Sequence, residues 1–318
     1  MLKQYIAALL FALLASSSLA QDTHFAQFYA NPLHLNPALA GGRFNGRLAL
    51  NFRNQWALAD QAFRTLAVSY DQYSNRLHGG WGFRLESDQQ MGQTLVSNAI
   101  SSTYAYRLTV SRNSYLQMGF QAGYAYERLD MSRLVFEDQL DGSQGVVHET
   151  AEYRGVLQSG HPLLATGMMW ASKRWWAGAS ASRLPRASGE LQLRANDEPQ
   201  IKTTLHGGME LLPGERSNWR LLPNLLFQQA GKSIKTNVGL YADNKTITVG
   251  AWLRSTNALS LLIGWQNKRL KSGYSYDVDF GARAAFGGAH ELSLIWELRV
   301  PRAKKVPISQ RYLLCPEF

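Results

Sequence analysis

The chain has 318 residues, of which 45% are hydrophobic and 11% aromatic, and its formal net charge is +10 at pH 7. A net positive charge of this size can indicate a nucleic-acid-binding protein. The arginines stand singly rather than in clusters, however, so we expect no nucleic-acid binding. The one cysteine, Cys315, leaves no internal disulfide to form, although exported chains meet an oxidising compartment.

The first twenty residues have the pattern of a secretory signal peptide. Lys3 is followed by an apolar run from Tyr5 to Ala15 and then by small residues up to Ala20. The run is shorter than the roughly 18 to 20 residues that a transmembrane helix needs, which argues against an anchor. We expect cleavage after Ala20 and a mature chain that begins at Gln21.

Residues 21–42, QDTHFAQFYANPLHLNPALAGG, form a separate lead-in segment. Two Asn-Pro pairs and a Gly pair argue against a regular helix or a central strand. The segment is nevertheless rich in apolar residues, with Phe25, Phe28 and Tyr29 as aromatic anchors. We therefore expect an extended segment that packs against the rest of the fold rather than a disordered terminus.

Segments that alternate between apolar and polar residues follow at short, regular spacing, which is typical of strands. The clearest has Met118, Phe120 and Tyr124 on one face, with Gln117 and Gln121 on the other. Long intervals alternate with short ones, so one end of the sheet is elaborate and the other plain. The predicted strands are residues 44–53, 62–72, 79–87, 94–107, 114–128, 163–172, 174–183, 201–211, 219–229, 233–242, 245–254, 259–267, 273–285 and 290–300.

This pattern predicts an all-β fold: a transmembrane antiparallel β-barrel of about 14 strands in the bacterial outer membrane. After the signal peptide no apolar run could form a membrane-spanning helix, and otherwise only a closed barrel satisfies its backbone in lipid. A soluble sandwich would share the alternation, but an even strand number favours the barrel. The expected divisions are a signal peptide at residues 1–20, a lead-in and possible plug at 21–42, the barrel at 43–300 and a periplasmic tail at 301–318.

The interval from Leu129 to Gly160 is too long and too polar for a tight hairpin, and in outer-membrane barrels such intervals lie outside the cell. It could bind a partner, or it could be a plain solvated acidic loop. Our candidates for partner binding combine residues of this loop with residues of the lead-in. They are Asp138, Asp141, His148, Glu152, Asn31, Pro32, Asn36 and Pro37.

The same loop comes nearest to a catalytic or metal site. His148 lies close to Ser143 and Asp141, but without a G-x-S-x-G context or a supporting strand. The acidic residues lack the spacing of a calcium loop, and the histidines of the chain lack metal-ligand spacing. We therefore expect no enzymatic activity, no bound metal and no cofactor.

Charged residues in the strands are expected to face the barrel interior, because Arg or Lys facing lipid at the midplane costs about 2 to 4 kcal/mol. Asp277 and Asp279 share a face and should pair with arginines such as Arg254, Arg283 or Arg299. They could instead bind an inserted segment, either the lead-in or a strand of a partner. The predicted lumen network comprises Arg47, Arg53, Arg84, Glu86, Asp277, Asp279, Glu291, Glu297 and Arg299.

Tryptophan and tyrosine are unusually frequent in the predicted strands. At strand ends their rings would form girdles at the level of the lipid headgroups. We expect the excess of Lys and Arg either to line a positively charged lumen or to form a rim that contacts the phosphates of outer-membrane lipid and lipopolysaccharide. The expected girdle residues are Trp81, Trp170, Trp175, Trp176, Trp219, Trp252, Trp265, Trp296, Tyr104, Tyr106, Tyr124 and Tyr126.

Four separated pieces of the sequence resemble one family: QFYANPLHLNPALAGG at residues 27–42, RNQW at 53–56, GYSYD at 273–277 and GGAHELSL at 287–294. The ending CPEF, at residues 315–318, is also similar to the ending common in that family. In this order, and over essentially the whole mature chain, the pieces resemble the PorP/SprF family of type IX secretion system membrane proteins of Bacteroidota.

The resemblance implies an outer-membrane barrel of about 14 strands that works with the type IX export apparatus, which serves gliding adhesins among other substrates. The implied partners are a secreted adhesin or another type IX substrate with a C-terminal sorting domain, and other type IX subunits. Some members look instead like core components linked to periplasmic, peptidoglycan-bound subunits, and the sequence does not separate the two branches. A passive porin or solute transporter with an open lumen is the alternative from a different class.

Overall fold

The computed structural model describes residues 25–42, 45–59, 62–141, 145–146, 149–151, 155–183, 201–211, 218–255 and 257–298. The predicted signal peptide and the predicted tail at 301–318 lie outside these residues, as do His148, Glu152 and Arg299 of the predicted sites.

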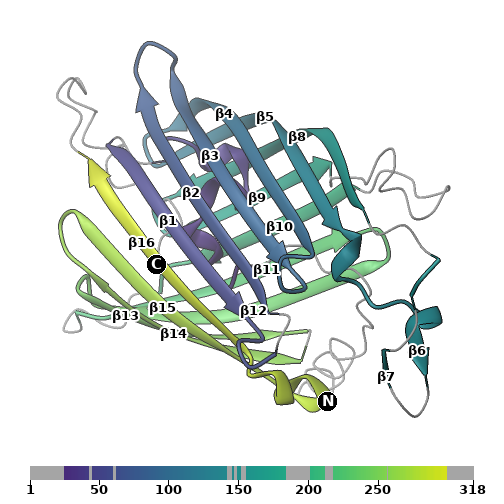
Figure 1. The fold of residues 1–318 in the computed structure, drawn as a ribbon. Helices are drawn as coiled ribbons and strands as arrows, with labels where there is room; N and C mark the ends of the chain where they lie inside the picture. The colour runs from purple at the N-terminus through teal and green to yellow at the C-terminus, as the bar shows by residue number, and fades with distance from the viewer. Residues whose placement is uncertain are drawn as a thin grey trace.

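Within this part of the chain, fourteen antiparallel strands close into one barrel, because the first strand, β1, pairs both with β2 and with the last strand, β16 (Figure 1). The prediction of a closed antiparallel barrel is confirmed. The strands are β1 (Gly46–Gln55), β2 (Phe63–Ser74), β3 (Gly79–Gln90), β4 (Leu95–Ser111), β5 (Ser114–Asp130), β8 (Val156–Ser172), β9 (Trp175–Arg183), β10 (Ile201–Met209), β11 (Arg220–Ala230), β12 (Ser233–Asp243), β13 (Ile247–Arg254), β14 (Ala258–Gln266), β15 (Leu270–Asp279) and β16 (Ala289–Leu298).

Most predicted strands coincide with observed ones to within a few residues, but two differ. The predicted strand 273–285 ends at Asp279, and Gly281–Phe286 form the 3-10 helix η6. The β15–β16 ladder stops at the pair of Asp277 and Ala289, so the backbone beyond it must find its hydrogen bonds locally. β8 begins well before the predicted residue 163, because its ladder with β5 continues through Pro162.

Side chains along each strand alternate between the outside and the inside of the barrel. On β16, Leu292 and Trp296 are 53% and 52% exposed, whereas Glu291 and Ser293 are buried. An apolar exterior opposite a polar interior is the arrangement that suits a barrel embedded in lipid. Among the described residues, no helix is both long enough and apolar enough to cross a membrane.

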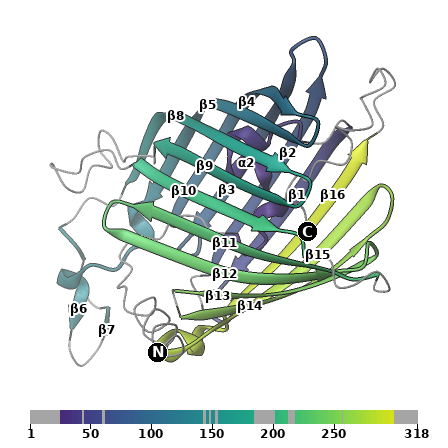
Figure 2. The same ribbon diagram turned by 180° about the vertical axis from the view of Figure 1, so that it is seen from behind.

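Residues 25–42 lie inside the barrel, where they form much of its core (Figures 1 and 2). They contain η1 (Phe28–Ala30), the helix α2 (Pro32–Leu35) and η2 (Pro37–Leu39). The expectation of an extended segment was wrong here, because each Asn-Pro pair begins a short helix. Proline suits the first helical position, since its φ is already helical and the amide hydrogen it lacks would have no partner there.

The two ends of the barrel differ in the length of their connections. The end at which β16 begins carries the two longest ones, between β5 and β8 and between β9 and β10, and is called the loop-rich end below; the opposite end is called the plain end. The β5–β8 connection includes η3 (Met131–Arg133), η4 (Glu137–Gln139) and a small separate sheet of β6 (Leu140–Asp141) and β7 (Gly145–Val146). This sheet projects beyond the barrel (Figure 2).

Candidate functional site in the barrel lumen

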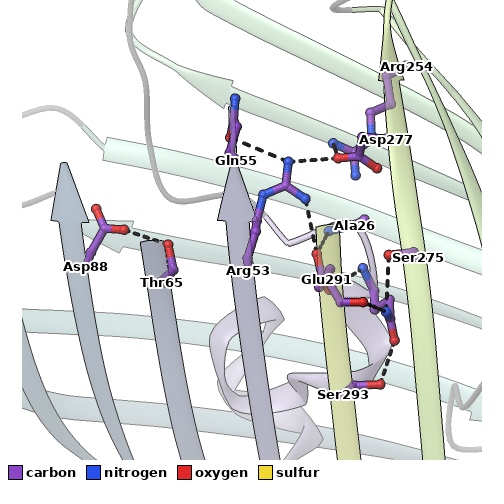
Figure 3. A network of polar contacts seen from close by, with 11 residues as sticks. Ala26, Arg53, Gln55, Thr65, Asp88, Arg254, Ser275, Asp277, Glu291 and Ser293 are labelled. Carbon is purple, nitrogen blue, oxygen red and sulfur yellow. Dashed lines mark hydrogen bonds and ion pairs between the residues drawn. The ribbon is translucent and has the colours of Figure 1, made fainter. Parts of the chain in front are cut away.

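The lumen site is centred on Glu291, whose side chain is fully buried on the inner face of β16. Its carboxylate accepts the backbone N–H of Ala26 at 2.6 Å and that of Gln27 at 2.8 Å (Figure 3). These two amides belong to the lead-in and precede its first helical turn. The barrel wall therefore supplies the acceptor that the irregular backbone of the lead-in needs.

Arginine side chains from two other strands neutralise the acids at this point. Arg53 on β1 donates from Nη1 to Glu291 at 3.2 Å and from Nη2 to Asp277 at 2.7 Å. Arg254 on β13 reaches the same oxygen of Asp277 at 3.2 Å. All four side chains are buried, and two positive charges balance two negative ones, which is the condition under which buried ions are tolerated.

The side chain of Gln27 completes the attachment of the lead-in at the loop-rich end. Its Nε2 donates to Ser275 Oγ at 3.1 Å and to the backbone oxygen of Glu291 at 3.2 Å. Its Oε1 accepts from Ser293 Oγ at 2.5 Å. Main-chain and side-chain groups of Gln27 are thus held by two adjacent strands, β15 and β16.

In the middle of the lumen, Asn36 joins the lead-in to the opposite wall. Its Nδ2 donates to the backbone oxygens of Met168 at 3.0 Å and Ala179 at 3.2 Å, and lies 3.1 Å from His206 Nε2. Its Oδ1 accepts the N–H of Ala38 at 2.9 Å, which caps η2. One amide therefore fixes both the local turn and its position against β8 and β9.

Near the plain end, the lead-in is held by a second set of buried charges. Asp71 accepts the N–H of Gly41 at 2.7 Å and pairs with Arg47, whose Nε is 2.8 Å from the carboxylate. Arg107 Nη2 donates to the backbone oxygen of Gly41 at 3.1 Å. Gly41 has a φ of +60°, and a Cβ there would lie 2.4 Å from the Cα of Gly80, so only glycine fits this close approach.

A third polar group holds the middle of the segment from the side of β3. His34 Nδ1 and Arg84 Nη1 each lie 3.1 Å from Glu86 Oε2. The three groups are mostly buried between the lead-in and the strand. Residues 25–42 are consequently bonded to the wall along their whole length, from the loop-rich end to the plain end.

The structure divides the predicted lumen network into separate groups. Arg53, Asp277 and Glu291 come together, whereas Arg84 and Glu86 form the group around His34, and Arg47 pairs with Asp71. Asp279 accepts a hydrogen bond from Trp56 Nε1 at 3.3 Å at the loop-rich end, outside the central group. Glu297 is half-buried at the far end of β16.

The predicted partner-binding residues fall into two places. Asn31, Pro32, Asn36 and Pro37 are buried in the lumen, and no described residue donates to or accepts from the side-chain amide of Asn31. Asp138 is exposed in the β5–β8 connection, where it accepts from Ala151 N–H and Thr150 Oγ1, each at 2.8 Å. These hydrogen bonds hold the pKa of Asp138 below its usual range. Asp141 lies in β6.

Two of the expected girdle residues face the wrong way for that role. Trp176 and Trp252 are buried inside the barrel, where Trp176 Nε1 donates to Tyr29 Oη at 3.0 Å and Trp252 packs on Phe28 with ring centroids 4.7 Å apart. Trp175 and Trp176 are neighbours on one strand, so they must point to opposite faces. The two-residue repeat of a strand could therefore have identified Trp176 as an inward-facing residue from the sequence.

Sequence reasoning missed several residues that hold the lead-in. Asp71 and Arg107 bind its backbone near Gly41, and Gln117 Nε2 donates to the backbone oxygen of Ala40 at 2.6 Å. Asn51 Nδ2 donates to the oxygen of Ala30 at 3.3 Å. All four are polar residues at inward positions of predicted strands. The alternation of the strands therefore predicted that their side chains face the lumen, but it did not predict that they bind the lead-in.

Solved structures similar to the chain are outer-membrane barrels of low sequence identity. The Ralstonia pickettii toluene transporter TbuX is 10% identical, with a TM-score of 0.48, and the match covers 90% of this chain and 97% of that one. The Pseudomonas putida toluene transporter TodX is 8% identical, with a TM-score of 0.44 and coverages of 89% and 94%. The Haemophilus ducreyi BamA structure is 8% identical, with a TM-score of 0.41 and coverages of 80% and 71%. None of the curated proteins compared with the chain matches it.

The family is established by the sequence itself. The family model for the type IX secretion system membrane protein PorP/SprF matches residues 17–296. This span contains the lead-in and every strand of the barrel except the last two residues of β16. A closed barrel in a secretion-system membrane family places the protein in the bacterial outer membrane. The chain belongs to the PorP/SprF family of type IX secretion system membrane proteins.

Proposed function

We propose that this protein is a non-enzymatic component of the type IX secretion system that supports the secretion or surface attachment of an adhesin-type substrate carrying a C-terminal sorting domain. The observation that carries the proposal is the course of residues 25–42, which cross the lumen and are bonded to the wall throughout. The assignment to the type IX secretion system rests on family membership. Because the lead-in occupies the lumen, we expect the protein to act by binding partners at its surfaces and loops rather than by conducting solutes.

The contacts of the lead-in favour this role over that of a passive porin. Solutes could use the lumen freely only if Ala26 and Gln27 left Glu291, and Gly41 left Asp71. A hydrogen bond to a charged group typically contributes about 1.5 to 3 kcal/mol, and release of the lead-in would break several of them at once. A segment held at both ends by such groups is suited to staying in place.

The proposal includes neither catalysis nor a cofactor. Within the described residues there is no group of three or more His, Cys, Asp or Glu side chains that could hold a metal ion. The acidic groups of the lumen are instead bonded to arginines and to backbone amides of the chain itself. Their arrangement serves attachment of the lead-in.

We place the contact with the secreted partner at the loop-rich end, around Asp138 and the β6–β7 sheet. This region projects beyond the barrel, and longer loops lie outside the cell in bacterial outer-membrane barrels (Figure 2). Asn31, Pro32, Asn36 and Pro37 are buried, so we assign them the indirect role of holding the lead-in.

The test is affinity purification of the tagged protein from outer membranes in mild detergent, followed by mass spectrometry. We expect a large secreted protein with a C-terminal sorting domain, whose recovery falls on deletion of residues 137–151. Recovery of periplasmic type IX subunits alone would indicate the core-component branch instead. A barrel that brings no partner and carries large steady currents in a planar bilayer would overturn the proposal in favour of a porin.

A further inference from the structure

The outer wall of β2 to β5 changes character in three successive rows of side chains as it approaches the loop-rich end. Each row runs across the four strands in the observed register, so its members are direct neighbours. The first row is Val68, Leu85, Ile100 and Tyr124, the second is Leu66, Ser87, Asn98 and Tyr126, and the third is Arg64, Gln89, Val96 and Arg128.

This order is that of a membrane interface. The first row is apolar, with Leu85, Ile100 and Tyr124 all more than half exposed on the outer face. The second row introduces the amide of Asn98 and the phenol of Tyr126, and tyrosine is favoured at headgroup level. The third row begins and ends with an exposed arginine, whose long side chain can bury its stem and place its charge in the headgroup layer.

The first two rows also line a groove of about 490 Å³ in the outer wall. Its apolar lining comes from Leu66, Val68, Leu85, Ile100 and the rings of the two tyrosines. The ring of Tyr124 lies over Gly160 of β8, where a Cβ would come within 2.0 Å of its hydroxyl. A groove with this lining, open to the bilayer, suits an acyl chain.

The arginines above the groove supply the charge complementarity for an anionic headgroup. Arg64 has no ion-pair partner among the described residues, and Arg128 shares Asp130 with Arg133, at 3.6 Å and 3.3 Å, which leaves a net positive charge there. Three strand spacings separate Arg64 from Arg128, roughly 14 Å at about 4.8 Å each. The separation spans a headgroup broader than a single phosphate.

We propose that this surface is a binding site for the lipid A part of lipopolysaccharide, with an acyl chain in the groove and phosphate on Arg64 and Arg128. The loop-rich end faces outward in bacterial barrels, so these rows lie in the outer leaflet, where lipopolysaccharide is the characteristic lipid. Guanidinium groups bind phosphate through two parallel hydrogen bonds, which gives the contact its direction. The site lies on the outer wall and does not depend on the proposed protein partner.

The test is native mass spectrometry of the full chain in detergent, titrated with purified bisphosphorylated lipid A. We expect one tightly held lipid A, and at least a five-fold loss of affinity in the double variant Arg64→Glu and Arg128→Glu. The matched control is Arg112→Glu, an exposed arginine in the β4–β5 turn at the opposite end, which should stay within two-fold of the unchanged protein. Filling the groove with Ile100→Trp should also weaken binding.

Two further titrations identify the ligand. Dephosphorylated lipid A and phosphatidylglycerol should each bind at least five-fold more weakly than lipid A. Equal affinity for phosphatidylglycerol, or unchanged lipid A affinity in the arginine double variant, would overturn the proposal. Folding of each variant is checked by the shift of the barrel band on heating in a denaturing gel, and if the charge reversal prevents folding, Arg64→Gln with Arg128→Gln replaces it with the same expectation.

Discussion

Arg53 and Glu291 face each other across the seam between the first and last strands of the barrel, with Arg53 Nη1 3.2 Å from Glu291 Oε2. The same carboxylate accepts the backbone amides of Ala26 and Gln27. One buried acid therefore contributes both to closure of the barrel and to retention of the lead-in. These two features are coupled, because the chain must bring residues 26, 53 and 291 together at once.

Replacing Glu291 with alanine should release the loop-rich end of the lead-in. The change leaves the amides of Ala26 and Gln27 without their acceptor and Arg53 with Asp277 alone, a loss of about 3 to 5 kcal/mol in stability. Hydrogen exchange of a peptide covering residues 25–30 should accelerate strongly. Leu292→Ala, on the lipid-facing side of the same strand, should leave that exchange unchanged. Equal protection in both variants would contradict the assigned role.

Replacing Gly119 with alanine should displace the lead-in from β5. A Cβ at this position would lie 2.4 Å from both the nitrogen of Ala38 and the carbonyl carbon of Pro37, and neither backbone atom can move freely. Overpacking of this kind typically costs about 1 to 3 kcal/mol. The temperature at which the folded band is lost in a denaturing gel should fall, whereas Ala122→Leu on the outer face should change it little. A Gly119→Ala protein as heat-resistant as the original would mean that the segment does not pack there.

Asn36 and Asn31 offer a matched pair of buried amides within one segment. Asn36 donates to two backbone oxygens and accepts from Ala38, so Asn36→Ala leaves buried groups unpaired at about 1 to 3 kcal/mol. The amide of Asn31 has no partner among the described residues, so Asn31→Ala should be nearly neutral or stabilising. Denaturant unfolding of the two variants in the same detergent measures which one loses more stability, and we expect it to be Asn36→Ala. Equal destabilisation would contradict the hydrogen bonding described for Asn36.

The strands and their faces could be predicted from the sequence because one side of each strand meets lipid. The alternation of Leu292, Leu294 and Trp296 with polar residues follows directly from that boundary, and β16 presents them as predicted. The same rule fails for Trp176 and Trp252, because an apolar residue on the inner face packs against the lead-in instead of lipid. Composition alone does not tell these two apolar environments apart.

The attachment of the lead-in could not be predicted, because it depends on register between distant strands. Arg53 and Glu291 are 238 positions apart, and only closure of the barrel makes them neighbours. The lead-in itself has no period, so its sequence indicates that it packs but not against which strands. Glycines such as Gly80 and Gly119 mark where its backbone touches the wall, but in the sequence they look like ordinary strand glycines.

The hydrogen bonds of Asp138 predict a pH-dependent ordering of the β5–β8 connection. Bonds from Ala151 N–H and Thr150 Oγ1 stabilise the ionised carboxylate and lower its pKa in the folded state. The stabilising contribution is therefore fully present above the unfolded-state pKa, about 3.9 for Asp, and is lost as the pH falls through the lower folded-state value. Exchange of the Ala151 amide, relative to its intrinsic rate, should be slow near neutral pH and rise on acidification.

The variant Asp138→Asn separates this effect from general acid unfolding. An amide oxygen can still accept a hydrogen bond but carries no charge, so exchange at residues 149–151 should be faster than in the original protein at neutral pH and lose its acid transition. Glu149→Gln, an exposed acid in the same connection, should keep the transition. If Asp138→Asn retained the same transition, the ordering of this connection would depend on a different acid, and the partner contact placed around Asp138 would lose its structural support.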